Sequence, residues 1–284
     1  MTTFLKACVI GDPIAHSRSP LIHGYWLRTL GIAGAYERAH VKAEDFAAFV
    51  RAMPEQGYAG ANVTVPHKER ALALCDEPSA RARAIGAANT LWFEDGTLRA
   101  DNTDGLGFLA HLDATHPGWR AVADHAVILG AGGAARGILH AILSRGVETI
   151  TVANRNLERA ECLARDMGEG SSSRIVARAW RDLPEAVRGA GLLVNATSLG
   201  MARQPPLDCP LDGLRDDAVV DDIVYAPLET ELLRRARHRG LRVVDGLGML
   251  LHQAAPGFER WFGVRPEVTP ELRALIVADL EKPA

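Results

Sequence analysis

The sequence NVTVPHK, residues 62–68, places a lysine directly after a strand-like stretch. Strand alternation predicts that Asn62 and Thr64 lie on one face while Val63 and Val65 face a core. Pro66 suits the first position of a helix, so Lys68 falls in the first turn, where the helix dipole disfavours a cation. Lys68 is therefore a candidate for proton transfer or for stabilising negative charge. The alternative is a surface lysine that the position merely tolerates.

The sequence DNTDG, residues 101–105, combines two acids with two hydrogen-bonding side chains just ahead of a predicted helix. Asp104 fits two roles. Aspartate is a good N-cap, so the residue could serve only to start the helix, or its carboxylate could belong to a reactive site. The residues alone leave both readings open.

Two serines stand at the start of another predicted helix, in HSRSP, residues 16–20. Ser19 followed by Pro20 predicts an N-cap with proline at the first helical position. A helix N-terminus that also carries the hydroxyls of Ser17 and Ser19 is equally suited to hold a carboxylate.

A dinucleotide-binding fingerprint stands in the second half of the chain, in VILGAGGAARGI, residues 127–138. The pattern Gly130-x-Gly132-x-x-Ala135 follows a predicted strand and opens a predicted helix, which is the context that the fingerprint requires. The glycines let backbone N–H groups approach a pyrophosphate, and the helix N-terminus adds partial positive charge. The alternative is a tight turn without a ligand.

The end of the next predicted strand favours NADP over NAD. NAD-binding proteins commonly have an acid there for the ribose hydroxyl, whereas this chain has Ala153-Asn154-Arg155-Asn156 followed by Arg159. The guanidinium of Arg155 can give charge-assisted hydrogen bonds to a 2′-phosphate, and Arg159 can add a second set. Arg159 also fits a solvated charge on a helix face.

The elements that must position these residues alternate between strands and helices, which predicts βαβ units and parallel sheets. In the first part of the chain the alternating pairs are Ala7 to Ile10 with Leu21 to Leu30, Ala35 to His40 with Glu44 to Met53, and Gly60 to Val65 with His67 to Leu74. The step Asp95-Gly96 then predicts a β-hairpin between residues 89–93 and 97–101.

A second series begins after Gly105. Strands are expected at His125 to Leu129, Thr149 to Ala153, Gly191 to Asn195, Ala218 to Ile223 and Arg242 to Asp245, with a helix at Ala134 to Ser144 and a helical tail at Met249 to Phe262 and Pro270 to Glu281. We therefore expect an α/β protein with a substrate-binding and catalytic domain at residues 1–104 and a doubly wound, Rossmann-type NADP-binding domain at residues 105–245. C-terminal helices at residues 246–284 would pack back on the first domain.

Composition narrows the functional class. The chain has 284 residues, a formal net charge of -3 and interspersed charges, so it lacks the basic surface that would favour nucleic acid or an anionic membrane. It has no apolar stretch near the roughly 20 residues of a membrane span. The four cysteines form no CxxC pair and the ten histidines have no ligand-like spacing, so we expect a cytoplasmic protein without a metal site. No sequence segment indicates a subunit interface, and both a monomer and a homodimer are compatible with the sequence.

Taken together, the motifs resemble those of the shikimate dehydrogenases. The resemblance covers nearly the whole chain, because GDPIAHSRSP, GANVTVPHKE, GAANT, DNTDG, GAGGAARG, NATSLGM, DIVYAP and DGLGMLLHQA occur in the order of that family. Two departures are mild: Ala88 replaces a frequent valine, and Asn156 replaces the threonine of an NRT motif.

The resemblance implies roles for individual residues. Lys68 and Asp104 look like the catalytic pair of the family. The implied substrate-binding residues are Ser17, Ser19, Thr64, Lys68, Asn89, Asp104, Tyr225 and Gln253. The implied NADP contacts are Gly130, Ala131, Gly132, Gly133, Ala134, Asn154, Arg155 and Arg159, with Ile223, Gly246 and Met249 near the nicotinamide.

The implied reaction is the reversible reduction of 3-dehydroshikimate to shikimate by NADPH, in aromatic amino acid biosynthesis. Whether Lys68 is the proton donor or an electrostatic anchor stays open at this point. Three other readings also stay open: a quinate/shikimate dehydrogenase, a dehydrogenase for an amino-substituted shikimate analogue, and a non-catalytic NADP-binding protein.

Overall fold

The computed structural model describes residues 4–282 and divides into two compact units. Unit 1 contains the chain up to Asp104 together with the segment from Leu251 onward, and unit 2 contains Gly105–Leu250. Two helices, α5 (Asp104–Thr115) and α10 (Gly246–Phe262), contain the points at which the chain passes from one unit to the other. Within residues 4–282, no helix combines the length and apolar character needed to span a membrane.

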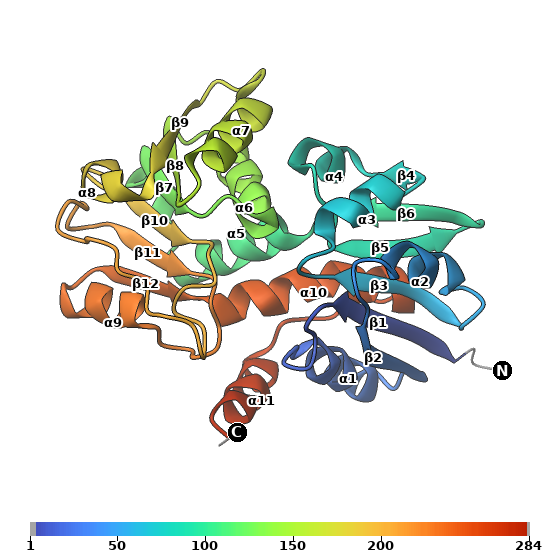
Figure 1. The fold of residues 1–284 in the computed structure, drawn as a ribbon. Helices are drawn as coiled ribbons and strands as arrows, with labels where there is room; N and C mark the ends of the chain where they lie inside the picture. Colours follow the sequence, from blue (N-terminus) through green and yellow to red (C-terminus); the bar gives the residue numbers. More distant parts are fainter. Residues whose placement is uncertain (1–3, 283–284) are drawn as a thin grey trace. The chain divides into compact units, whose positions relative to one another are not determined.

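Unit 1 is built on a mixed sheet with the strand order β2-β1-β3-β5-β6-β4 (Figure 1). Its strands are β1 (Leu5–Gly11), β2 (Gly34–His40), β3 (Tyr58–Val63), β4 (Glu77–Pro78), β5 (Thr90–Glu94) and β6 (Thr97–Asp101). Strand β1 pairs in parallel with β2 and β3, whereas β5 runs antiparallel to both β3 and β6. The hairpin β5–β6 turns at Asp95 and Gly96, which both have positive φ, so the predicted Asp-Gly hairpin is confirmed.

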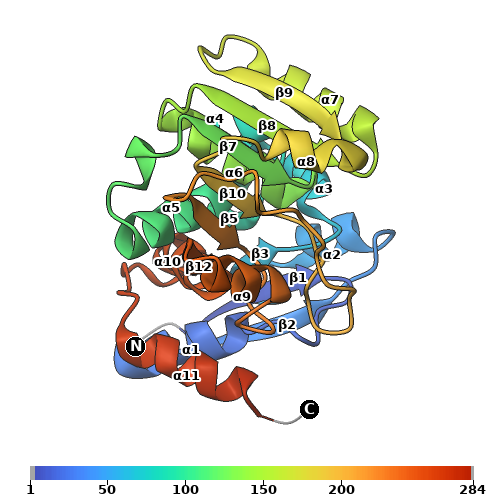
Figure 2. The same ribbon diagram turned by 90° about the vertical axis from the view of Figure 1, so that its left-hand side faces the viewer.

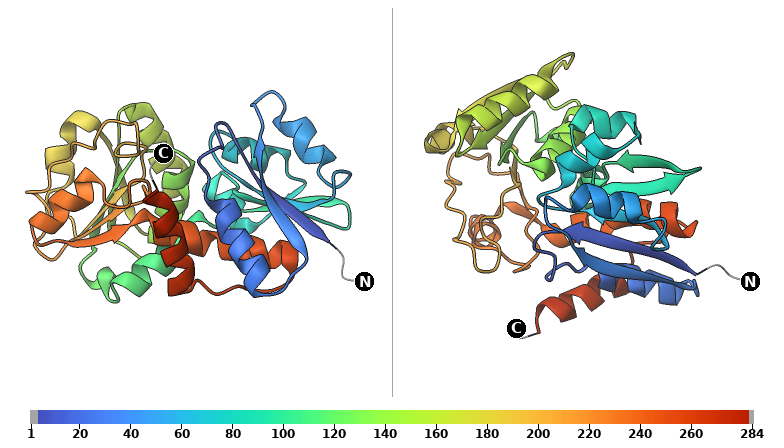
Figure 3. Two further views of the ribbon diagram at one scale, coloured as in Figure 1. Left: turned by 90° about the horizontal axis from the view of Figure 1, so that it is seen from below. Right: turned by 45° about the vertical axis from the view of Figure 1, so that its right-hand side comes forward.

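Helices cover both faces of this sheet. They are α1 (Ser19–Thr29), α2 (Phe46–Ala52), α3 (Lys68–Leu74), α4 (Ala80–Ile85), α11 (Pro270–Leu280) and the later part of α10. Alternate strand residues such as Cys8, Ile10 and Val63 pack with residues of α2, α3 and α4. The opposite face carries an aromatic cluster in which His23 of α1 lies against Tyr36 of the sheet and Phe258 of α10. Helix α11 packs against α1, as the left panel of Figure 3 shows.

The close approach of α10 to the sheet depends on Gly60. The indole Nε1 of Trp261 donates a hydrogen bond to the carbonyl oxygen of Leu91 at 2.9 Å. A Cβ on Gly60 would lie 2.2 Å from both that oxygen and that nitrogen. Strand β3 therefore needs a residue without a side chain at this position.

Three predictions about helix and strand ends in unit 1 are wrong by one or two residues. Strand β3 ends at Val63, so Val65 is 69% exposed and does not face the core. Helix α3 begins at Lys68 with His67 at the N-cap, which leaves Pro66 outside the helix. Helix α1 begins at Ser19 with Arg18 at the N-cap, so Ser19 is the first helical residue and not the cap. The turn after β3 takes up residues that strand alternation assigned to the strand.

Unit 2 contains a parallel sheet with the order β12-β11-β10-β7-β8-β9. Its strands are β7 (His125–Leu129), β8 (Thr149–Asn154), β9 (Arg174–Ala179), β10 (Leu192–Asn195), β11 (Val219–Asp222) and β12 (Arg242–Asp245). The order runs outward from β7 to β9 on one side and from β10 to β12 on the other. The switch point of the sheet therefore lies between β7 and β10, the place where open α/β sheets bind ligands at the carboxyl ends of their strands.

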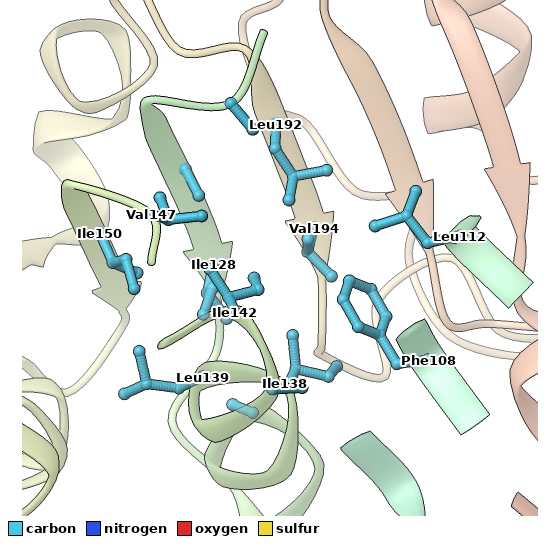
Figure 4. Packing of buried hydrophobic residues seen from close by; sticks show 14 of the residues in the cluster. Phe108, Leu112, Ile128, Ile138, Leu139, Ile142, Val147, Ile150, Leu192 and Val194 are labelled. Atoms are coloured by element: carbon cyan, nitrogen blue, oxygen red, sulfur yellow. The ribbon is translucent and has the colours of Figure 1, made fainter. Parts of the chain in front are cut away.

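Helices lie on both faces of this sheet as well. They are α5, α6 (Gly133–Ser144), α7 (Leu157–Gly168), α8 (Leu183–Ala186) and α9 (Glu231–His238), with two 3₁₀ turns at Trp119–Ala121 and Trp180–Asp182. Ile128 and Val194 pack with residues of α5, α6 and α7, and Figure 4 shows the side chains of Phe108 and Ile138 in this core. The strand residues that point to the other face, such as Val127 and Leu193, pack with α8 and α9. Figure 2 shows α7 running along β8 and β9. The predicted α/β class with a Rossmann-type doubly wound sheet is confirmed.

Candidate active site

Lys68 and Asp104 form a buried ion pair in unit 1. Lys68 is the first residue of α3 and Asp104 the first residue of α5. The Lys68 Nζ donates to Asp104 Oδ2 at 2.5 Å, and the two side chains are only 15% and 7% exposed. The carboxylate of Asp104 is thus directed to a lysine and not to helix capping, and its reading as a simple N-cap is wrong.

Asn89 fixes the second oxygen of the Asp104 carboxylate. Its Nδ2 donates to Asp104 Oδ1 at 2.8 Å, and its Oδ1 accepts from the backbone N–H of Thr103 at 2.9 Å. The side chain is 2% exposed, and its amide orientation is set because each end meets a partner of the right kind. Asp104 therefore has one oxygen held by an amide and the other by an ammonium group.

Gln253 of α10 joins the same cluster. Asn89 Nδ2 lies 3.3 Å from Gln253 Oε1, and the Thr103 hydroxyl donates to the carbonyl oxygen of Gln253 at 2.9 Å. Residues far apart in sequence are thus connected by direct hydrogen bonds. Of the residues singled out from the sequence, the structure brings Lys68, Asn89, Asp104 and Gln253 together.

The ammonium group of Lys68 keeps donor capacity for a ligand. An ammonium group has three donors, and within residues 4–282 Asp104 is the acceptor that it meets. Removing one member of a buried ion pair leaves the other charged and without compensation, which is costly. Lys68 is therefore a positively charged donor that the buried carboxylate of Asp104 holds in place.

Ser17 and Ser19 lie at the start of α1. The Ser17 Oγ accepts from the backbone N–H of Ser19 at 3.3 Å, and Arg38 donates to the Ser17 carbonyl oxygen at 2.6 and 3.0 Å. Ser17 is half-buried, whereas Ser19 is 5% exposed. Thr64 is half-buried just after β3, where its backbone N–H donates to the carbonyl oxygen of Ile10 at 2.9 Å.

A chain of buried polar side chains connects Tyr36 through Asn62 to Asn89, and sequence reasoning did not assign Tyr36 or Asn62 to the site. The hydroxyl of Tyr36 donates to Asn62 Oδ1 at 2.7 Å. The Asn62 Nδ2 donates to the Asn89 carbonyl oxygen at 3.2 Å. Asn62 stands in the motif that contains Lys68, which was a usable signal, whereas nothing in the local sequence marks Tyr36.

Burial changes the ionisation of the aromatic cluster behind this chain. The pKa of Tyr36 is raised well above its ordinary value, chiefly because burial disfavours the phenolate. The ring of His23 stacks on Tyr36 with centroids 3.9 Å apart, and burial lowers the pKa of His23 to about 3, with an opposing contribution from Asn62. Both groups are therefore uncharged at neutral pH, and neither competes with Lys68 as a charged group.

In unit 2 the glycine-rich turn lies between β7 and α6. Gly130 has a φ of 106°, and a Cβ there would lie 3.0 Å from the carbonyl oxygen of Ala196 at the end of β10. Gly132 is the N-cap of α6 and has no side-chain capping bond, and a Cβ on it would meet nothing within 4 Å. The helix has no acid in its first turn. The turn thus offers open space and backbone donors at the switch point, which fits the pyrophosphate of a dinucleotide.

The residues expected to recognise the adenosine phosphate lie at the end of β8. Asn154 ends the strand, and its Nδ2 donates to the carbonyl oxygen of Asn156 at 2.9 Å. Asn156 is the N-cap of α7, and its Oδ1 accepts from the backbone N–H of Arg159 at 3.2 Å. Arg155 and Arg159 are exposed, and within the described part of the chain no acid pairs with either guanidinium. Asn156, which replaces the threonine of the NRT motif, therefore caps helix α7.

Ile223, Tyr225, Gly246 and Met249 belong to the other half of unit 2. A Cβ on Gly246, the first residue of α10, would lie 2.2 Å from the carbonyl oxygen of Ile223, so these two backbones are in close contact. Met249 is 8% exposed in the core, and Tyr225 is half-buried in the segment after β11.

A buried polar cluster at the same edge orders the segments that follow β10 and β11. The Asp222 carboxylate accepts from Asn195 Nδ2 at 2.8 Å and from the Thr230 hydroxyl at 2.6 Å. Burial raises the pKa of Asp222, and these hydrogen bonds oppose the shift. Within residues 4–282 no group of three or more acids, histidines and cysteines could hold a metal ion.

Comparison with known proteins gives the same family in three segments of the chain. The model of the shikimate dehydrogenase substrate binding domain matches residues 9–91, that of shikimate / quinate 5-dehydrogenase matches residues 117–202, and that of the shikimate 5′-dehydrogenase C-terminal domain matches residues 246–275. A protein of Rhodopseudomonas palustris (strain HaA2) named shikimate dehydrogenase (NADP(+)) is 62% identical over 274 residues, which are 96% of each chain. The chain belongs to the shikimate dehydrogenase family.

Solved structures of shikimate and quinate dehydrogenases share the fold. The shikimate 5-dehydrogenase of Thermus thermophilus, in complex with NADP(H) and shikimate, is 36% identical with a TM-score of 0.83, covering 97% of this chain and 99% of that one. The quinate dehydrogenase of Corynebacterium glutamicum, in complex with NAD, is 31% identical with a TM-score of 0.88, covering 97% of this chain and 100% of that one. Proteins with this fold therefore differ in substrate and in cofactor, and these preferences depend on the residues of the site.

Proposed function

We propose that the protein catalyses the reversible NADPH-dependent reduction of 3-dehydroshikimate to shikimate, a step in aromatic amino acid biosynthesis. The observation that carries this proposal is the buried pair of Lys68 and Asp104, oriented by Asn89. A single chain that has this pair and a dinucleotide turn in the correct context has the parts that a nicotinamide-dependent ketone reduction requires.

The substrate has a carboxylate at one end and ring oxygens at the other, and the candidate residues divide accordingly. The hydroxyls of Ser17 and Ser19 at the start of α1 hold the carboxylate, where the helix N-terminus favours negative charge. The ring oxygens are held by Thr64, Lys68, Asn89, Asp104 and Gln253, and Tyr225 is the further substrate-binding residue that the family resemblance implies. These assignments are supported by the hydrogen bonds that already preorganise most of the unit 1 residues.

Lys68 acts on the substrate ketone. When bound, NADPH supplies the hydride that reduces the carbonyl carbon. Negative charge then develops on the ketone oxygen, and the ammonium group of Lys68 stabilises this charge and offers a proton to it. Asp104 holds Lys68 through its Oδ2 and is itself held by Asn89, so the donor does not have to be reoriented during the reaction.

NADP fits the residues of unit 2. Gly130, Ala131, Gly132, Gly133 and Ala134 would hold the pyrophosphate, because their backbone donors stand at the N-terminus of α6. Asn154, Arg155 and Arg159 would hold the adenosine 2′-phosphate, and the two exposed guanidiniums supply the positive charge that an NAD site does not need. Ile223, Gly246 and Met249 would lie near the nicotinamide.

The same fold serves a relative that is named quinate dehydrogenase and is solved with NAD, so a quinate or NAD preference is the second candidate. The absence of an acid from the sequence Asn154-Arg155-Asn156 favours NADP. We also propose that the partners of the protein are small molecules and not nucleic acid or membranes, and that it acts in the cytoplasm, consistent with four cysteines that are all free.

The test is the initial rate of the absorbance change of nicotinamide, with shikimate and quinate each combined with NADP and NAD. The proposal predicts a clear preference for shikimate with NADP. Comparable turnover of quinate, or of either substrate with NAD, would assign the chain to the second candidate. An amino-substituted shikimate analogue belongs in the same panel. Absence of turnover with every pair, together with retained NADP binding, would contradict catalysis and favour a non-catalytic NADP-binding protein.

A further inference from the structure

Strand β9 places an additional arginine beside the residues proposed to bind the 2′-phosphate. Strands β8 and β9 are parallel neighbours at one edge of the unit 2 sheet, and Ala153 is in register with Arg178. Both strands end within one residue of this pair, at Asn154 and Ala179. Arg178 therefore lies at the carboxyl edge of the sheet, at the same level as the segment that contains Arg155.

The alternation of side chains sets the face of the sheet to which Arg178 points. Residues in register on parallel strands point to the same face, and residues two apart on one strand do so as well. Ala153 packs in the core on the α8 and α9 face, so Arg178 points to that face, and Arg155 is the first residue after β8. From the strand spacing and the rise per residue, the Cα atoms of Arg155 and Arg178 are about 8 Å apart, a separation that two arginine side chains can bridge around a phosphate.

The positive charge at this edge is not neutralised by nearby acids. Arg178 is half-buried, and its Nη1 donates to the carbonyl oxygen of Ala177 at 3.2 Å. Within residues 4–282 no acid forms an ion pair with it or with Arg155 and Arg159. Asp166, an acid on the adjoining helix α7, is engaged by Arg136 of α6 at 3.0 Å, and this contact lowers the pKa of Asp166.

We propose that Arg178 is a third cationic ligand for the 2′-phosphate of NADP and a determinant of NADP over NAD. A phosphate monoester carries about two negative charges and offers three acceptor oxygens, more than one guanidinium can satisfy. A half-buried arginine contributes more than an exposed one, because its charge is less screened by water. The inference rests on the proposed NADP specificity, and it concerns a residue outside the strand-to-helix motif that identifies that site.

The test compares binding of 2′,5′-ADP and 5′-AMP to the full-length protein by titration calorimetry at one ionic strength. The two ligands differ by the 2′-phosphate, so their affinity ratio reports that group and requires no turnover. The variant is Arg178→Ala. The matched control is Arg174→Ala, which removes an exposed arginine from the opposite end of the same strand, in register with Thr149.

Arg178→Ala is expected to weaken 2′,5′-ADP binding about tenfold, which is the loss of one charge-assisted contact, and to leave 5′-AMP binding within about twofold. Arg174→Ala should change neither affinity. Unchanged 2′,5′-ADP binding by Arg178→Ala, or an equal loss for both ligands, would overturn the role of Arg178.

Arg155→Ala separates failure of this inference from failure of the proposed function. Selective loss of 2′,5′-ADP binding in Arg155→Ala but not in Arg178→Ala would leave the NADP site intact and remove only Arg178 from it. A wild-type protein that binds 2′,5′-ADP no more tightly than 5′-AMP would contradict both the inference and the NADP specificity.

Discussion

The reactive part of the site is a pair of oppositely charged side chains that depend on each other. Lys68 is half-buried in the first turn of a helix, where the helix dipole opposes a cation, and the Asp104 carboxylate at 2.5 Å compensates for both partial burial and dipole. Asn89 supplies a further hydrogen bond to that carboxylate at 2.8 Å. The sequence alone left Asp104 between an N-cap and a site residue, because a local motif does not show which distant side chain a carboxylate meets.

His23 should make unit 1 less stable as the pH falls. Its folded-state pKa of about 3 lies below the ordinary value of 6.5, so the unfolded chain binds a proton first as the pH falls below 6.5. The stability contribution is complete above pH 6.5 and is lost progressively down to about pH 3. Lowering the pH from 7 to 5 should cost about 2 kcal/mol through this residue.

His23→Phe keeps a ring that can stack on Tyr36 and removes the proton site. Chemical denaturation at several pH values should give a flatter pH dependence of the free energy of unfolding for this variant than for the wild type. Parallel curves for the two proteins would show that His23 does not titrate on unfolding in the way its burial implies.

At the scale of elements, strongly patterned segments were predictable and short connecting ones were not. The strand before the dinucleotide fingerprint, His125 to Leu129, was predicted with its observed bounds. The β5–β6 hairpin was predicted with its observed turn at Asp95 and Gly96. The two-residue strand β4 and the six-residue helix α4 were not predicted, because segments this short have too few residues to establish a hydrophobic period. Strand β9 was also missed, since its alternation is interrupted by Arg174 and Arg178.

Glycines in unit 1 have opposite roles that depend on the element around them. Gly60→Ala should destabilise the fold by about 1–3 kcal/mol or more. The new Cβ would lie 2.2 Å from the carbonyl oxygen of Leu91 and from the indole nitrogen of Trp261, so β3 would have to move away from α10.

Gly24→Ala is the matched substitution in the interior of α1. The nearest atom to its Cβ would be the flexible end of Arg28 at 3.4 Å, so the variant should gain about 0.5–1 kcal/mol from reduced backbone entropy of the unfolded chain. Denaturant melts of the two variants measure both effects. Equal stabilities would contradict the packing assigned to Gly60.

At the scale of the whole molecule, the family was recognisable because weak motifs occur in a fixed order from residue 11 to residue 254. The candidate site is discontinuous: Gln253 of α10 joins residues from the first 104 positions of the chain. Such a contact could be inferred from resemblance but not from periodicity or spacing, since no local property of α10 indicates its partner. The polar chain through Tyr36 and Asn62 escaped prediction for the same reason.

The most direct test of the central claim is the initial rate of shikimate oxidation by NADP in the wild type, Lys68→Ala and Lys42→Ala. Lys42 is an exposed lysine of the same unit and serves as the control. The wild type and Lys42→Ala should turn over at similar rates, whereas Lys68→Ala should lose roughly 10²–10⁴-fold in kcat because the donor to the substrate oxygen is gone. If Lys68→Ala retained most of the wild-type rate, the Lys68–Asp104 pair would not be the catalytic centre.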